Sequence, residues 1–207
     1  MRYNLDLSAF SIHEYKELLK HQNLLPGRRI LWQNIDHNFA IIQNQNITNL
    51  ADLKKQLSSP QKLASFASIT GISEEYLLLL KREIGSLEQK PVSLTSFPGL
   101  DSSLVSSLSS RGINTSKEYY DCGQSDVVEI FCLCDLVRIN GVGAVAAKTF
   151  YEAGYRSVVE VAGANAEAML EKISKVNDTK GYYKARLGIK DIQFCIDFAS
   201  LLIKYGN

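Results

Sequence analysis

The chain has 207 residues, of which 45% are hydrophobic, and its formal net charge is +1. This length predicts one or two domains with an ordinary core. No stretch approaches the roughly 20 apolar residues of a membrane span, and the first ten residues lack the apolar centre of a secretory signal. The four cysteines show no disulfide framework. We therefore expect a cytoplasmic protein with reduced thiols and no membrane partner.

The spacing of apolar residues predicts helices along almost the whole chain, and no segment requires a strand. Ser11-x-x-Glu14 has the pattern of a capping box before the first helix, and Ser58-Ser59-Pro60 stops a later one. The stretch Gly85–Ser93 contains Pro91 and is the best linker candidate. We therefore expect an N-terminal helical region over residues 1–90, with a domain boundary near residue 90.

Within this region, Thr70-Gly71-Ile72-Ser73 joins two apolar runs and predicts a first helical hairpin at residues 70–73. Ser73 would cap the following helix. A degenerate repeat unit is expected at residues 46–53, where Asn46 replaces a glycine and tolerates the left-handed backbone conformation.

Residues 91–207 contain two similar segments, near 94–121 and 136–163, related by a constant offset of 42 positions without a gap. A match of this kind indicates a duplicated unit. In each segment a glycine fits a helix C-cap, and a hydroxyl residue followed three positions later by glutamate predicts a capping box. The sequence thus predicts a duplicated helix-hairpin-helix domain with a C-terminal helix. The matched pairs are Leu94/Leu136, Phe97/Ile139, Gly99/Gly141, Leu100/Val142, Leu108/Phe150, Gly112/Gly154, Ile113/Tyr155 and Thr115/Ser157, and the two capping boxes are Thr115/Glu118 and Ser157/Glu160.

The second segment contains the tight turn Gly141-Val142-Gly143 directly before a helical stripe. Bare amide groups at a helix N-terminus form an anion site that suits a phosphate group. The candidate binding residues are the five around the turn and one lysine further along the helix, namely Asn140, Gly141, Val142, Gly143, Ala144 and Lys148. The alternative is a purely structural turn between packed helices. The first segment carries Asp101 in place of the second glycine, and its turn is expected to be structural.

A second candidate is the loop around Lys180–Arg186, in which Lys180, Lys184 and Arg186 alternate with tyrosines. Charge combined with stacking holds single strands in many proteins. The alternative is a surface loop whose tyrosines pack onto the core. Residues 136–207 carry a net charge of +3, whereas residues 63–135 carry −5.

Enzymatic and cofactor signals are weak. Residues 141–146 satisfy G-x-G-x-x-A, and Glu160 lies near the distance of a ribose-binding acid. Against a dinucleotide site, Glu160 already serves as a capping residue, and no further strand–helix units follow. Cys132-x-Cys134 has no partner pair at zinc spacing, and no hydrolase, P-loop or zinc-protease motif occurs. We therefore expect no enzyme, no cofactor and no metal.

Four short segments carry a resemblance to a known family, namely Thr70–Ser73, Arg138–Gly143, Ala153–Ser157 and Val176–Asn177. Through them, residues from about 60 to 205 resemble an uncharacterised bacterial family, a domain of unknown function built of helix-hairpin-helix units. The resemblance implies an all-helical fold like that of DNA-repair hairpin domains (SAM-like), with no catalytic residue. This chain departs from the family by inserting an extra hairpin copy at residues 94–121.

The sequence therefore predicts an all-α protein of tandem helix-hairpin-helix repeats with an N-terminal helical extension. The expected function is non-enzymatic, sequence-independent binding of the DNA phosphate backbone. The alternative is a scaffold for protein–protein interaction whose hairpins are purely structural. The near-zero net charge and the acidic middle region favour that alternative.

Overall fold

The computed structural model describes residues 2–22, 24–123, 126–184 and 187–206. Within these ranges it contains helices and two isolated β-bridges but no strand, so the expected all-α class is confirmed. The chain divides into an N-terminal unit, residues 6–88, and a C-terminal unit, residues 89–207 together with the first five residues. Across the described ranges, no helix is both long and apolar enough to cross a membrane.

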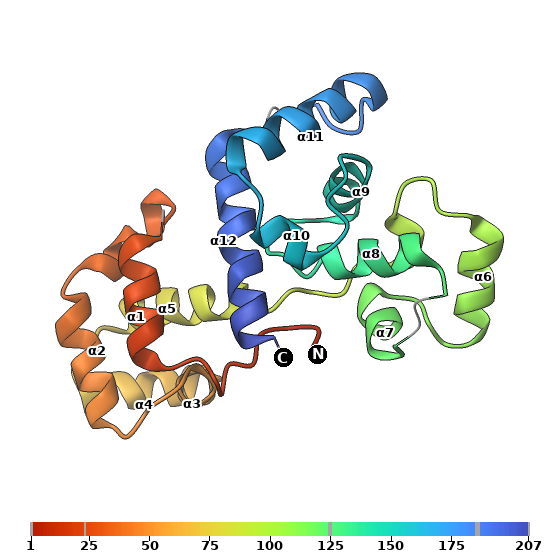
Figure 1. Cartoon of the computed structure of the whole chain (residues 1–207). Coiled ribbons are helices and arrows are strands. Elements are labelled where there is room, and N and C mark those ends of the chain that lie inside the picture. The colour runs from red at the N-terminus through yellow and green to blue at the C-terminus, as the bar shows by residue number, and fades with distance from the viewer. Residues whose placement is uncertain (1, 23, 124–125, 185–186, 207) are drawn as a thin grey trace. The chain divides into compact units, whose positions relative to one another are not determined.

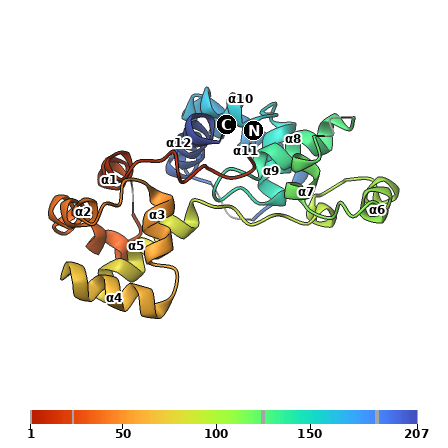
Figure 2. The same ribbon diagram turned by 90° about the horizontal axis from the view of Figure 1, so that it is seen from below.

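The N-terminal unit is built of short helices whose ends follow the local sequence signals. Ser11 and Glu14 form the predicted capping box, and the Ser73 side chain caps its helix by accepting from the Tyr76 N–H. Asn46 has a φ of 59°, the left-handed conformation expected of it. The elements of this unit, seen from below in Figure 2, are α1 (Ile12–His21), η1 (Pro26–Trp32), α2 (Ile35–Asn44), α3 (Leu50–Gln56), α4 (Pro60–Thr70) and α5 (Glu74–Ser86).

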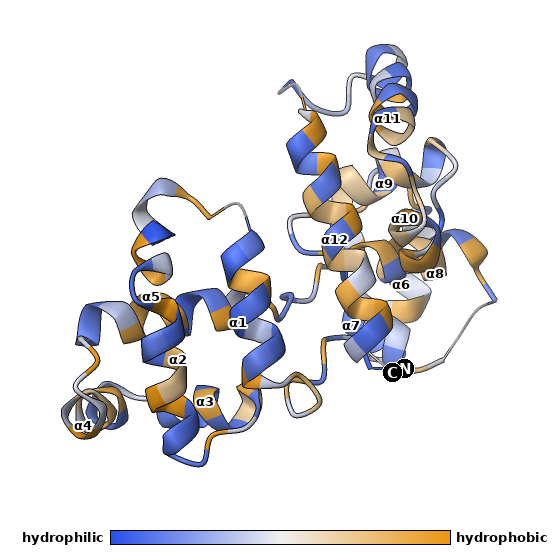
Figure 3. Ribbon diagram, turned by 60° about the vertical axis from the view of Figure 1, so that its left-hand side comes forward, coloured by the Kyte–Doolittle hydropathy of each residue, from blue (hydrophilic) through white to orange (hydrophobic). Residues whose placement is uncertain are grey.

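In the C-terminal unit, the long last helix packs against α10 and α11 (Figure 1). Apolar and polar residues alternate along this helix, α12, as is typical of an amphipathic helix (Figure 3). The two ends of the chain lie side by side, because the Arg2 N–H donates to the Gly206 carbonyl at 2.9 Å. The elements are η2 (Leu94–Ser96), α6 (Ser102–Ser110), α7 (Ser116–Asp121), α8 (Val128–Leu136), α9 (Ala144–Glu152), α10 (Val158–Ala162), α11 (Ala166–Lys180) and α12 (Ile189–Tyr205).

Segments 94–121 and 136–163 share several local features. Gly99 and Gly141 have φ values of 76° and 84°, and Gly112 and Gly154 have values of 79° and 92°. Residues with a side chain rarely adopt this conformation, which explains a glycine at all four positions. At the end of each segment a hydroxyl side chain caps the next helix, α7 or α10. The two capping glutamates differ. Glu118 accepts from the N–H of the N-cap residue Thr115, as predicted, whereas Glu160 accepts from the N–H of Arg156, the residue before its N-cap.

The segments differ ahead of the turn. A helix of nine residues, α8, precedes Gly141, whereas only the short 3₁₀ turn η2 precedes Gly99. Residues 92–94 are instead held to the start of α7, since the Val92 carbonyl accepts from the Ser116 N–H at 2.7 Å. Gly141 is therefore flanked by two α-helices, α8 and α9, whereas Gly99 is flanked by one, α6, and by η2.

The sequence also placed one helix end too early. Lys180 was expected in a loop, but α11 continues through Lys180 and ends at Gly181, whose φ is 65°. Glycine at this position closes the helix in the usual left-handed C-cap conformation.

Candidate nucleic-acid interface

The turn between α8 and α9 is held by one buried side chain. Val142 is 5% exposed, and its N–H donates to the Ile139 carbonyl at 3.0 Å. Gly143 is exposed and extended, with φ −86° and ψ −178°, and a Cβ there would meet no atom within 4 Å. Asn140 and Ala144, on either side, are partly buried. The amide of Val142 is thus committed to the turn itself, while the backbone at Gly143 remains open.

The N-terminus of α9 has no side-chain cap, because its N-cap residue is Gly143. Amides in the first turn of a helix have no partner within the helix. In segment 94–121, which matches this one, the N-cap residue Asp101 supplies a partner for such amides. Its Oδ1 accepts from the N–H of Ser103 at 2.7 Å and from the N–H of Leu104 at 3.3 Å. Hydrogen bonds from the Ser103 hydroxyl and from these two amides lower the pKa of Asp101.

The constant offset of 42 places Val145 and Ala146 where Ser103 and Leu104 stand. In segment 94–121, a carboxylate oxygen therefore accepts from these first-turn amides of α6. In segment 136–163, the two corresponding amides of α9 have no side-chain cap. Sequence reasoning stopped at Ala144 and missed these two donors. The sequence contained a signal for them. Asp101 stands where segment 136–163 has Gly143, and an aspartate at an N-cap accepts from the amides of the second and third helical residues.

A buried ion pair fixes the C-terminal end of α8, directly before the turn. Arg138 is 4% exposed, pairs with Asp135, and donates from Nε to the Tyr3 carbonyl at 3.0 Å. The second carboxylate oxygen of Asp135 accepts from the Val158 N–H at 2.7 Å, at the start of α10. The guanidinium carbon also lies 4.5 Å from the ring centre of Tyr120. Both charges are therefore paired and hydrogen-bonded, which gives the turn a rigid support.

Lys148 does not extend freely from α9. It is 9% exposed and forms ion pairs with Glu129 and, at 3.5 Å, with Glu152. Burial lowers the pKa of Lys148, but the Glu129 and Glu152 carboxylates outweigh burial and raise it. Lys148 therefore stays charged, and its charge is balanced inside the fold rather than directed at an external anion.

The two described lysines of the 180–186 segment are exposed, Lys180 in the last turn of α11 and Lys184 in the loop that follows. Arg186 lies outside the described residues. Tyr182 and Tyr183 are half-buried. The Tyr182 hydroxyl donates to Glu152 at 2.8 Å, while the Asn177 side chain bonds both backbone groups of Tyr183 at 3.0 Å. This placement agrees with tyrosines that pack onto the core, and it leaves the lysines as the accessible groups.

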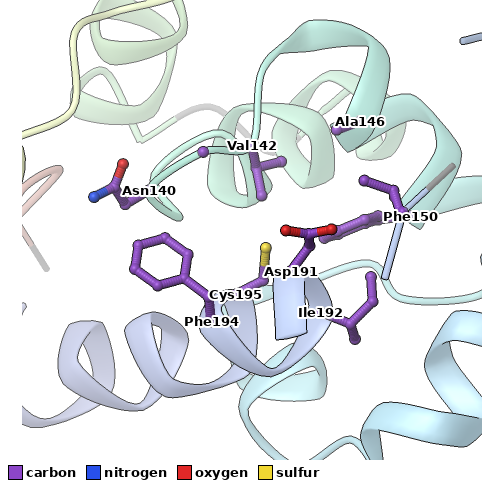
Figure 4. Close-up of a pocket in the computed structure, with 10 residues that line it drawn as sticks. Asn140, Val142, Ala146, Phe150, Asp191, Ile192, Phe194 and Cys195 are labelled. Atoms are coloured by element: carbon purple, nitrogen blue, oxygen red, sulfur yellow. The ribbon is translucent and has the colours of Figure 1, made fainter. Parts of the chain in front are cut away.

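A pocket of about 240 Å³ lies between the turn and α12 (Figure 4). Its floor is apolar, and the Asp191 carboxylate and the Phe194 ring face it from α12. Phe194 is 36% exposed, and its ring lies 3.9 Å from where a Cβ of Gly141 would stand. The lining residues are Asn140, Gly141, Val142, Ala146, Phe150, Leu187, Asp191, Ile192, Phe194 and Cys195.

The cysteines and the glycine motif have structural explanations. Cys132 and Cys134 are buried on α8, and burial raises the pKa of both thiols. Among the described residues, no group of three or more His, Cys, Asp or Glu side chains could hold a metal ion. A dinucleotide fold needs a strand before its glycine motif, whereas residues 128–136 form a helix.

No curated protein and no solved structure matches the chain. A family model does match part of it. The matched region begins in the last residue of α7, includes α8 to α11 and most of α12, and leaves out the segment with the Asp101 turn. The expected likeness to an uncharacterised family is thus narrower than the predicted range of 60–205: residues 121–200 match the family described as "Domain of unknown function (DUF4332)".

Proposed function

We propose that the C-terminal unit binds the phosphate backbone of DNA without reading base sequence and without catalysing a reaction. In this proposal α8, the turn and α9 act as a helix-hairpin-helix element, and the amides of Val145 and Ala146 donate to one phosphate group. The observation that supports this proposal most directly is the contact made by Asp101. Its carboxylate accepts hydrogen bonds from the amides of Ser103 and Leu104, which correspond to those of Val145 and Ala146. A helix N-terminus favours such an anion through both its free amides and its dipole.

The backbone amides position the protein, and exposed lysines supply charge. Lys180 and Lys184 are exposed in the same unit. Each lysine that neutralises a phosphate releases counterions, so two such contacts predict that log affinity falls with log salt with a slope of about −2. Lys148 is not expected to contribute, because Glu129 and Glu152 balance its charge.

The test is a fluorescence-anisotropy titration with single-stranded, double-stranded and junction DNA at two salt concentrations. The variant is Gly143→Asp, which copies the carboxylate cap of the matching segment, and the control is Gly143→Ala, which adds a methyl group in open space. We expect salt-sensitive binding by the wild type and by Gly143→Ala, and its loss in Gly143→Asp. Equal affinity of all three proteins would contradict the proposal.

A second candidate is a protein–protein scaffold with structural hairpins. The observation in its favour is that Val128 and Val159 of the C-terminal unit are 62% and 63% exposed, although both are large apolar residues. The absence of binding to any DNA form at low salt would favour this candidate. The substitution Val159→Asp should then abolish association with a protein partner, whereas Gly143→Asp should not affect it.

A further inference from the structure

We propose that the pocket between the turn and α12 takes one unpaired nucleobase of the bound DNA. This inference rests on the proposed function and goes beyond it, since it gives the protein a preference for DNA in which a base is not paired. The occupant is a single nucleobase that belongs to the same strand whose phosphate lies on the α9 amides.

The size of the pocket suits one ring system. Its volume of about 240 Å³ lies just below the range of about 300–1,000 Å³ for sites that enclose a complete small-molecule ligand. A dinucleotide cofactor would exceed it. The pocket is also open to solvent along its rim, where Phe194 is partly exposed, so a base attached to a strand can enter.

The chemistry of the lining suits an aromatic ring with a polar edge. Val142, Phe150 and Ile192 form an apolar floor, and Phe194 offers a ring for stacking. Cys195 also lines the pocket, and burial raises the pKa of its thiol to about 12, so at neutral pH it is an uncharged wall. Stacking on an aromatic side chain tolerates any base, in agreement with sequence-independent binding.

One carboxylate lies at the wall of this apolar pocket. Asp191 accepts a hydrogen bond from the Gly188 N–H at 2.8 Å through Oδ2. A carboxylate has room for further donors, and the exocyclic amino groups of cytosine and adenine are donors of this kind. Among unpaired bases, the pocket should therefore hold cytosine or adenine more tightly than thymine, which offers no amino group. Paired DNA, whose bases stay stacked, is still bound without regard to sequence.

The position of the pocket links it to the phosphate site. Ala146 takes part in both, because its amide is one of the two uncapped donors and the residue also lines the pocket. A phosphate group on the first turn of α9 and a base against the next part of the same helix would thus belong to neighbouring groups of one strand. Gly141 keeps the passage between the turn and Phe194 free of a side chain.

The test compares a paired duplex with the same duplex carrying one bulged cytosine, one bulged thymine or one abasic site, by fluorescence anisotropy at low salt. The variants are Phe194→Ala, Phe194→Trp and Ile203→Ala. Ile203 is the matched control because it is on the same helix, is 42% exposed and does not line the pocket. We expect the bulged cytosine to bind about 5- to 100-fold more tightly than the paired duplex. This advantage should disappear in Phe194→Ala and persist in the other two variants.

Two results would overturn the inference. If paired and bulged duplexes bind equally, while Gly143→Asp abolishes both, the pocket takes no base and the phosphate proposal stands. If the bulged cytosine binds more tightly but Phe194→Ala keeps the full advantage, the base is recognised elsewhere. Failure of the wild type to bind any of these DNAs would instead refute the proposed function, and with it the inference.

Discussion

Replacing Gly143 with aspartate should make the protein more stable and at the same time unable to bind DNA. Gly143 has the extended conformation of an N-cap residue, and a side chain there meets no atom within 4 Å. Asp101 shows how a carboxylate at this position bonds the second and third amides of the helix. The substitution therefore installs an internal anion on the amides that we assign to phosphate.

The magnitude follows from the preference for aspartate over glycine at an N-cap. This preference is worth a few tenths of a kcal/mol, a net figure that already includes the attraction between the carboxylate and the helix N-terminus and the freedom of glycine in the unfolded chain. The free energy of unfolding should thus rise by roughly 0.3–0.5 kcal/mol, which raises the melting temperature by about 1–2 °C.

The assay pairs thermal unfolding with anisotropy titration on the same samples. DNA affinity should fall at least about tenfold in Gly143→Asp, because the carboxylate occupies the amides and repels the phosphate. Gly143→Ala should keep the wild-type affinity. Gly143→Asn, which can cap without a charge, should fall between them. A more stable Gly143→Asp protein that still binds with wild-type affinity would refute the assignment of these amides to phosphate.

Three further predictions concern charge, the buried ion pair and thiol reactivity. Lys180→Ala and Lys184→Ala should each make the slope of log affinity against log salt shallower by about 1, and an unchanged slope would remove that lysine from the interface. Arg138→Ala leaves Asp135 buried without its partner and should lower the free energy of unfolding by about 3–5 kcal/mol in a denaturant titration, whereas the exposed Arg156→Ala should change it by less than about 0.5 kcal/mol. Cysteine labelling at pH 8 should modify Cys122 quickly and the three buried cysteines slowly, and a second fast thiol would contradict the packing of α8 or α12.

Local chemistry explains the parts of the fold that the sequence predicted. Asn46, Gly112 and Gly154 adopt the left-handed conformation, and Ser11 and Thr115 cap their helices in capping boxes, as expected. Each of these features depends on residues within four positions of one another. Such short-range signals keep their meaning whatever the rest of the chain does.

Two of the features that the sequence missed depend on distant residues. Glu129, which pairs with Lys148, is 19 positions away on another helix. No local pattern relates these two residues, whereas the other partner of Lys148, Glu152, is four positions away and was a local signal that was overlooked. The same holds for the segment before Gly99, where contacts between residues 92–94 and the start of α7 replace the expected first helix of a hairpin. Tertiary contacts override local helix preference in such places.

The most direct test of the phosphate-binding account is a ¹H–¹⁵N NMR titration of the full chain with a short DNA duplex at low salt. The account predicts that the largest shift changes occur at the amides of Gly143, Val145 and Ala146, and that the corresponding amides of Ser103 and Leu104 stay unchanged because Asp101 occupies them. Shift changes confined to other surfaces, with these three amides unaffected, would contradict the account.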